Sequence, residues 1–182
     1  MSTLKVDTIL KRTGTGTITL GQSGDTLAIP AGATIANSGT ATGFGGVMSP
    51  MFRAYNTGGF TANADTMTNF ADTEVFDIGS CYDTSSKRFT PNESGYYFFI
   101  VNARTNSTST WNYLSARLLK NGSQFASNIN NNVSSGSVHI TGVCLLNGSS
   151  DYVEGQIYCN SSNRDFYGGE SENSFTGFKL IT

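Results

Sequence analysis

Hydrolytic chemistry usually depends on histidines and carboxylates, and this chain of 182 residues has a single histidine. His139 lies in the segment Ser-Val-His-Ile-Thr, where alternation places it on the face opposite Val138 and Ile140. A catalytic triad or a zinc site would need partner residues that the sequence does not show. We therefore interpret His139 as a structural residue.

The acidic residues between positions 65 and 83 offer material for a pair of carboxylates, which a glycosidase needs close together. They are Asp65, Asp72, Glu74, Asp77 and Asp83. Any folded protein offers as many, and the Asp-x-Asp-x-Asp-Gly pattern of a calcium loop is absent. The sequence therefore predicts no enzyme activity, no cofactor and no metal site, with calcium binding by these acids as the alternative left open.

The cysteines form an odd set, Cys81, Cys144 and Cys159, without a Cys-x-x-Cys pair. This pattern indicates neither a disulfide framework nor a zinc site. We expect buried free thiols that act as small hydrophobic residues. A bridge between Cys144 and Cys159 is the alternative.

Surface recognition is the chemistry that remains. Three polar stretches cover residues 106–111, 127–136 and 160–169. Aromatic residues lie in or beside two of them: Trp111 with Tyr113, and Phe166 with Tyr167. Rigid aromatic rings among Ser, Asn and Gly are typical of binding surfaces, and stacking on sugars is a natural use for them. Packing of Trp111 and Tyr113 in the sandwich or in a subunit interface is the alternative.

The overall composition excludes several classes of protein. Gly, Ser, Thr and Asn make up almost half of the chain, which is typical of strands and turns. The 11 basic and 13 acidic residues give a net charge of -2, so no basic excess exists for nucleic acid. No stretch approaches the ~20 apolar residues of a membrane span, and the start shows no signal-peptide run. We expect folding in a cytoplasm, without nucleic acid binding or membrane insertion.

The first 47 residues differ from the rest in their lack of large side chains. Of the 12 Phe, 8 Tyr and 1 Trp, only Phe44 lies in residues 1–50. So little apolar area cannot offset a backbone ordering cost of about 1 to 2 kcal/mol per residue. Short alternating pieces separated by Gly-rich turns would expose every strand edge, so we expect them to pair with other copies or another protein. A flexible linker is the alternative.

This segment also carries a resemblance. The opening Met-Ser-Thr-Leu-Lys-Val-Asp-Thr-Ile, followed by Thr/Gly-rich repeats ending in Ile-Pro-Ala-Gly-Ala-Thr, resembles the N-terminal segments of tailed-phage fibre and appendage proteins over residues 1–45. In such proteins this segment joins the appendage to the virion. The resemblance implies contact with other virion proteins through residues 1–47, with Leu4, Val6 and Ile9 as attachment residues.

Residues 48–182 contain many short apolar or alternating runs separated by Asn, Gly and Ser. The expected strands are 51–55, 74–78, 96–101, 113–119, 138–146, 152–158 and 174–181. None has a sustained helical period. This arrangement predicts an all-β sandwich or barrel.

One set of spacings within this part is more specific. The residues are Asp77, Tyr82, Phe89, Gly95, Tyr97 and Phe99. Their order resembles the signature of the complement C1q globular domain, one of the tumour necrosis factor-like jelly rolls. Further matches, such as Leu-Leu-Lys-Asn-Gly and the terminal Ser-Phe-Thr-Gly-Phe-Lys-Leu, extend the resemblance over nearly all of residues 50–182. Phe70 is one position early, and Val101 replaces the last aromatic of the signature.

The resemblance implies a jelly-roll β-sandwich that forms tight threefold trimers. Segment 95–101 agrees, because it is apolar on both faces and a single sandwich covers only one face of each sheet. The other face therefore needs a second subunit. The aromatics expected in the core or the trimer interface are Tyr82, Phe89, Tyr97, Phe99, Phe175 and Phe178.

Together these patterns predict a non-enzymatic, homotrimeric structural protein of a tailed-phage virion. It would be a short tail fibre, a spike or a capsid decoration, with the host-surface glycan as a candidate ligand. A secreted C1q-like lectin or cytokine is the first alternative, disfavoured by the absence of a signal peptide and of a Gly-x-y stalk. A glycan-cleaving tailspike is the second, disfavoured by size.

Overall fold

The computed structural model describes residues 9–10, 16–36, 38, 48–106, 113–131, 136–160 and 164–180. The chain divides into two units, Met1–Phe44 and Gly45–Thr182, each of which is described by itself. The boundary expected after residue 47 falls in residues 39–47, outside the described residues, and stays a prediction. Leu4 and Val6 also lie outside them.

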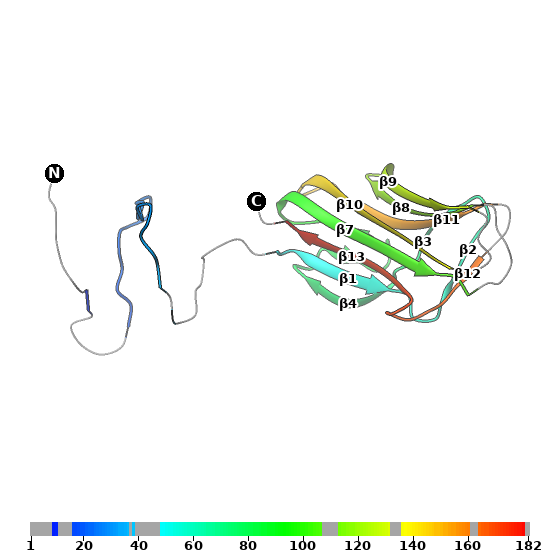
Figure 1. The fold of residues 1–182 in the computed structure, drawn as a ribbon, viewed down its shortest axis with the longest axis horizontal. Helices are drawn as coiled ribbons and strands as arrows, with labels where there is room; N and C mark the ends of the chain where they lie inside the picture. Colours follow the sequence, from blue (N-terminus) through cyan, green and yellow to red (C-terminus); the bar gives the residue numbers. More distant parts are fainter. Residues whose placement is uncertain are drawn as a thin grey trace. The chain divides into compact units, whose positions relative to one another are not determined.

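The first unit, where described, is an extended chain with two turns (Figure 1). Two hydrogen bonds between Gln22 and Asp25, of 3.0 and 2.7 Å, close one turn. The Ala33 amide donates to the Pro30 carbonyl at 3.1 Å in the other. All of residues 16–36 are exposed, and Ile9 is 56% exposed. The β pieces expected here form no strand ladder among the described residues of this unit.

The second unit, hereafter the head, is built from strands and loops (Figure 1). The strands are β1 Met51–Tyr55, β2 Phe60–Ala62, β3 Met67–Asn69, β4 Thr73–Ile78, β5 Tyr82–Asp83, β6 Arg88–Phe89, β7 Ser94–Arg104, β8 Leu114–Lys120, β9 Ser123–Asn130, β10 Ser137–Asn147, β11 Val153–Cys159, β12 Arg164–Phe166 and β13 Asn173–Lys179. No helix occurs among the described residues, so none there could span a membrane.

The strands form two main sheets that pack as a sandwich. The first has the order β10-β7-β13-β1-β4, and the second has the order β5-β6-β11-β8-β9 with β3 also on β11. A small sheet pairs β2 with β12. This architecture confirms the predicted all-β jelly-roll sandwich. All pairings between named strands are antiparallel, and each strand of the first sheet meets partners distant in sequence.

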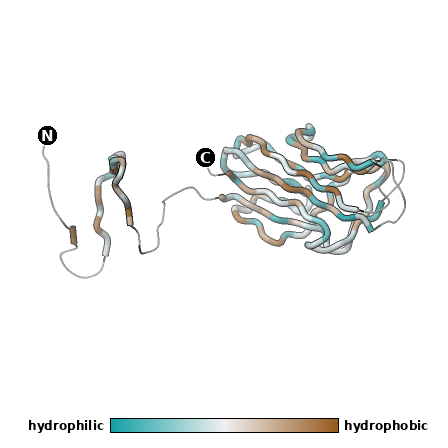
Figure 2. The backbone as a smooth tube through the Cα atoms, in the orientation of Figure 1, coloured by the Kyte–Doolittle hydropathy of each residue, from teal (hydrophilic) through white to brown (hydrophobic). Residues whose placement is uncertain are grey.

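Strand β7 shows how the sequence pattern sets the layers. Tyr97, Phe99, Val101 and Ala103 are fully buried, whereas the residues between them are half-buried or exposed. Alternate side chains of a strand point to opposite faces, so the first set faces the other sheet and the second set faces outwards. Figure 2 shows apolar residues recurring along the strands of the head.

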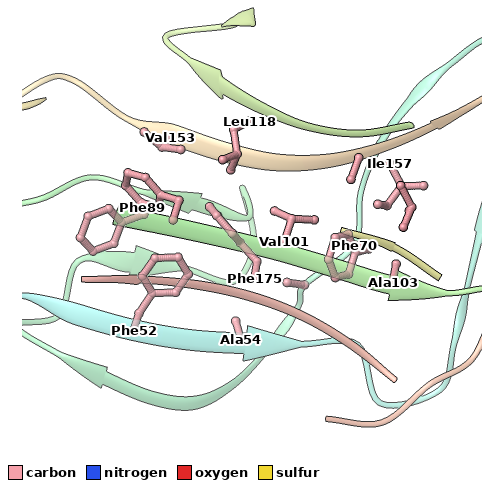
Figure 3. Close-up of a cluster of buried hydrophobic side chains, with 14 of the residues drawn as sticks. Phe52, Ala54, Phe70, Phe89, Val101, Ala103, Leu118, Val153, Ile157 and Phe175 are labelled. Carbon is pink, nitrogen blue, oxygen red and sulfur yellow. The ribbon is translucent and has the colours of Figure 1, made fainter. Parts of the chain in front are cut away.

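Aromatic rings dominate the core between the sheets (Figure 3). The Phe52 ring stacks on Tyr82 and on Phe89, with ring centroids 4.5 and 4.7 Å away, and Phe175 meets it edge-on at 4.8 Å. Gly177 leaves room for another ring, because a Cβ there would lie 2.6 Å from the Phe99 side chain. Such close packing makes truncation of a core phenylalanine cost about 3 to 5 kcal/mol.

Asp77 has a structural role that explains its spacing from Tyr82. Its carboxylate accepts the Cys81 amide at 3.1 Å and the Tyr82 amide at 2.9 Å. The Tyr82 hydroxyl in turn donates to the Ala71 carbonyl at 2.6 Å. These bonds fix the turn that delivers the Tyr82 ring to the core.

The three cysteines are free thiols, as expected. Cys81 and Cys159 are buried and Cys144 is half-buried. Cys144 lies on β10 of the first sheet, whereas Cys159 lies on β11 of the second sheet. The alternative of a bridge between Cys144 and Cys159 is therefore wrong.

Candidate functional site

The outer face of the first sheet carries a continuous apolar row. Ladder pairing places Val143, Phe98, Phe178, Met51 and Ile78 side by side across all five strands. The Phe98 and Phe178 rings lie 5.4 Å apart between centroids. Partners in register on neighbouring strands point to the same face, so these five side chains form one surface.

Neighbouring rows extend this surface. Leu145 pairs with Tyr96 on one side of the row. On the other side lie Ile100 and Phe76, with Thr176 and Arg53 between them. We call these residues together the apolar face: Met51, Phe76, Ile78, Tyr96, Phe98, Ile100, Val143, Leu145 and Phe178. Tyr96, Val143 and Leu145 are each about half exposed, at 49, 49 and 52%. Contiguous apolar patches of this kind mark interaction surfaces.

The outer face of the second sheet has the opposite character. A Cβ on Gly155 would meet Val101 and Phe175 in the core, so its neighbours on β11, Glu154 and Gln156, point outwards with Tyr158. We define the polar face by the outward residues Asn69, Arg88, Ser115, Arg117, Glu154, Gln156 and Tyr158. They include three charged groups, and the apolar side chains in register with them are separate from one another: Leu119 beside Glu154, Ile129 beside Ser115 and Met67 beside Tyr158.

A hydrogen-bonded cluster organises one part of the polar face. Glu154 is only 5% exposed, and its Oε1 accepts from Arg88 Nε at 3.1 Å and from Asn69 Nδ2 at 3.0 Å. The Arg88 guanidinium also lies over the Tyr152 ring, 4.2 Å from the centroid. The hydrogen bond to Glu154 is the main reason why the pKa of Arg88 is raised. One oxygen of this nearly buried carboxylate thus accepts from two donors.

A hollow of about 250 Å³ lies at another part of the polar face and is lined by Tyr113, Arg117, Tyr158 and Asn160. Arg117 donates from Nε to Ser115 Oγ at 3.2 Å and from Nη2 to the Tyr113 hydroxyl at 3.3 Å. Its guanidinium lies 4.3 Å from the centre of the Tyr158 ring.

The Tyr158 hydroxyl is held in place by a carboxylate. Its hydroxyl donates to Asp65 Oδ1 at 3.1 Å. The bond to this carboxylate raises the pKa of Tyr158. The ring beneath Arg117 is therefore fixed at both its face and its hydroxyl.

The aromatic residues expected at the surface lie in different environments. Tyr113 is half-buried beside Arg117, and Tyr167 is 42% exposed beneath Arg104, whose guanidinium lies 5.1 Å from its centroid. Trp111 lies outside the described residues. The described lining of the hollow at Tyr113 does not include Tyr167, so these residues do not join the two rings in one site.

Phe166 requires a correction. Its side chain is only 2% exposed and stacks on Phe60 at 4.6 Å, because β12 pairs with β2 and turns the ring into the core. It is thus a core residue, and the expectation of surface recognition by this ring is wrong. The nearby hollow of about 280 Å³ offers a ligand mainly the polar groups of Thr61 and Asp165, which bond to each other at 2.6 Å.

The residues expected in the core or interface divide into two groups. Tyr82, Phe89, Tyr97, Phe99 and Phe175 are buried within the single head, whereas Phe178 is half-buried on the apolar face. The spacing of these aromatics in the sequence does not separate the two roles. Tyr96 and Phe98, the outward aromatics of β7, were not predicted individually as site residues. The pattern that indicated them is that segment 95–101 is apolar on both faces.

The acidic residues considered for catalysis or calcium binding have separate structural roles. Asp72 accepts from the Asn56 amide group at 2.7 Å, while Asp83 caps a turn by accepting from the Ser85 amide at 2.8 Å and the Ser86 hydroxyl at 2.8 Å. The Ser86 and Ser85 bonds lower the pKa of Asp83. Within the described ranges, no three His, Cys, Asp or Glu residues gather as metal ligands.

Comparison with known proteins identifies the head. Residues 51–180 match the C1q domain. The chain belongs to the C1q domain family. This C1q domain begins with β1 and ends just beyond β13, so the family covers the whole sandwich. Among curated proteins, none matches the sequence.

Solved structures share the fold of this C1q domain at low sequence identity. Murine APRIL at pH 8.0 superposes with a TM-score of 0.57 and 11% identity, over 71% of this chain and 98% of that chain. The PRD1 vertex protein P5 gives a TM-score of 0.57 and 18% identity, over 74% and 99%. The Eiger TNF of S. frugiperda gives 0.52 and 10%, over 72% and 92%. The C1q domain therefore has the tumour necrosis factor-like fold.

Proposed function

We propose that this protein is a non-enzymatic homotrimer whose C1q domains form the head of an appendage on a tailed-phage virion. The apolar face is the observation that supports trimer formation most strongly. A row of five apolar side chains crosses the outer side of a whole sheet, and its two end members, Val143 and Ile78, are 49 and 51% exposed. Burial of such a surface favours assembly through the hydrophobic effect.

A closed threefold arrangement suits this surface. C1q and tumour necrosis factor-like domains associate as trimers, and closure leaves no apolar face for further growth. Polar residues border the apolar rows, with Asn102 and Ser174 paired by a short hydrogen bond next to them. The apolar area thus ends within the sheet. Its polar border resembles the polar rim of protein interfaces.

The virion assignment is supported by the first unit. Its described residues are exposed and alternate apolar with polar side chains, as in Ile18, Leu20, Leu27 and Ile29. A segment of this kind gains stability only from partners. In the proposal, residues 1–47 join the head to other virion proteins, and Leu4, Val6 and Ile9 take part in that attachment. Structural likeness to a vertex protein, that of PRD1, agrees with a place on a virion.

A secreted binding protein is the second candidate. Family membership and the likeness to APRIL and to Eiger TNF favour it. Location separates the two candidates, because a virion protein co-purifies with particles and a secreted protein does not.

Deletion of residues 1–47 tests the proposed function. We expect the head to stay folded and to scatter light with three times the mass of its chain, while it is lost from purified virus particles. Normal incorporation of the truncated head into particles would contradict the assignment of the first unit.

A further inference from the structure

Two arginines of the head share one arrangement, in which the guanidinium lies over a tyrosine ring and also binds a glutamate. They are Arg88 with Tyr152 and Glu154, and Arg104 with Tyr167 and Glu172. The guanidinium carbons lie 4.2 and 5.1 Å from the ring centres. The ion pairs measure 3.1 and 3.0 Å. In both cases a carboxylate forms an ion pair with the stacked arginine.

Arg117 has the same stack without the carboxylate. Its guanidinium carbon lies 4.3 Å from the Tyr158 ring centre, while Nε and Nη2 donate to Ser115 Oγ and the Tyr113 hydroxyl. Among the described residues, no carboxylate lies within 4.0 Å of it. Both hydrogen bonds go to neutral oxygens, and neither uses Nη1. Within this chain's described part, the half-buried Arg117 therefore forms no ion pair.

The guanidinium is also held in place. Two hydrogen bonds from different nitrogens and one ring face restrict its rotation, and the Asp65 bond to the Tyr158 hydroxyl restricts the ring. A planar, pre-organised guanidinium binds a carboxylate through two parallel N–H donors. Pre-organisation lowers the entropy that a ligand must lose on binding.

The surroundings of Arg117 favour a small hydroxylated ligand. The hollow measures about 250 Å³, below the roughly 300 to 1,000 Å³ typical of sites for drug-sized molecules. Its walls include Tyr113 and Tyr158, whose rings meet at 86°, and Asn160. Ring faces suit the C–H surface of a sugar.

We propose that this hollow, the Arg117 site (Tyr113, Arg117, Tyr158 and Asn160), binds the carboxylate of a uronic acid residue in an acidic polysaccharide. The inference deepens the proposed function, because it names a ligand class for the head and rests on that head acting at a surface. The site lies on the polar face, opposite the apolar face, so trimer formation through the apolar face leaves it accessible.

A matched pair of sugars tests the proposal on the full-length chain. Methyl glucuronide and methyl glucoside differ at one position, where the first carries a carboxylate and the second a hydroxymethyl group. Isothermal titration should show the glucuronide binding at least about tenfold more tightly, as expected for a charge-assisted hydrogen-bond pair. Equal binding of the two sugars, or binding of neither at about 10 mM, would overturn the proposal.

Two arginine variants localise the effect. Arg117→Gln should lower glucuronide affinity about tenfold or more, whereas Arg104→Gln should leave it unchanged, because Arg104 already pairs with Glu172. Melting curves of both variants confirm that they fold. Equal loss in both would contradict a site at Arg117. Sodium acetate that competes as well as the glucuronide would overturn the saccharide assignment.

The oligomeric mass is recorded on the same samples. A monomer that binds glucuronide through Arg117 would contradict the proposed trimer and leave the site standing. A trimer that binds neither sugar would contradict the site and leave the proposed trimer standing.

Discussion

The two outer faces of the sandwich differ although both sheets satisfy the same requirement of an apolar inner side. On the first sheet, ladder pairing aligns Val143 with Phe98 and Phe178. On the second, β11 presents Glu154 and Gln156 outwards. A sandwich needs one apolar face per sheet, so the additional apolar face of the first sheet indicates a requirement beyond folding of the single chain. We infer that one face serves assembly and the other faces solvent and ligands.

The largest expected change in stability distinguishes the inward side chains of β7 from the outward ones. Phe99→Ala should lower the free energy of unfolding by about 3 to 5 kcal/mol, because Phe99 is fully buried. Thermal melts of the wild type should shift upward with protein concentration, because assembly is coupled to stability. Phe99→Ala should lower the melting temperature at every concentration and keep that shift.

The control is the adjacent outward residue. Phe98→Ala should weaken the concentration dependence itself, because Phe98 lies on the apolar face. Melting temperatures that are independent of concentration in the wild type would contradict the assignment of this face to assembly.

The sequence predicted the strands that carry a strong apolar or alternating pattern. The short strands and the eight-residue β9 were missed. The strands expected at 51–55, 74–78 and 138–146 correspond to β1, β4 and β10. Strands such as β5 and β6 have two residues each, too few for a period to show. Their positions depend on pairing with distant strands, which a local pattern does not encode.

Site residues were harder to predict for a related reason. Phe166 stands among polar residues in sequence, yet pairing of β12 with β2 buries it. Arg117 and Tyr158 lie 41 positions apart and meet only because β8 pairs with β11. The outward aromatics Tyr96 and Phe98 alternate with inward ones, and a run that is apolar on both faces does not reveal which side faces the core.

A second prediction concerns alkaline pH. Burial raises the pKa of Cys144 from 9.0 to about 11 and that of Tyr97 from 10.0 to about 12. It also raises the pKa of Tyr82. As pH rises above 9, the unfolded chain loses these protons before the folded head does, so the free energy of unfolding should fall between pH 9 and pH 12.

Denaturant titrations at pH 7, 9 and 11 measure this effect. The pH 7 and pH 9 curves should differ little, and the pH 11 curve should show lower stability. Tyr97→Phe removes one of the titrating groups and should flatten the decline above pH 10. A free energy of unfolding that rises with pH over this range would show that these groups are not protonated in the core.

A third and smaller effect belongs to the polar face. Glu154→Gln should reduce stability by about 1 to 2 kcal/mol, because the nearly buried carboxylate loses its charge-assisted bonds to Arg88 and Asn69. The Arg88 side chain is 42% exposed, so water compensates part of the loss. The mass by light scattering should not change. Dissociation of this variant would place the polar face in the subunit interface.

The most direct test of the different roles of the two faces is the mass of two matched variants by multi-angle light scattering. Val143 on β10 and Ile129 on β9 are both β-branched and are 49 and 43% exposed, but Val143 pairs with Phe98 and Ile129 pairs with Ser115 of the polar face. Val143→Asp should scatter as a single 19.4 kDa chain, because a charge in the interface loses its hydration. Ile129→Asp should keep three times that mass. Equal masses for the two variants would contradict the account.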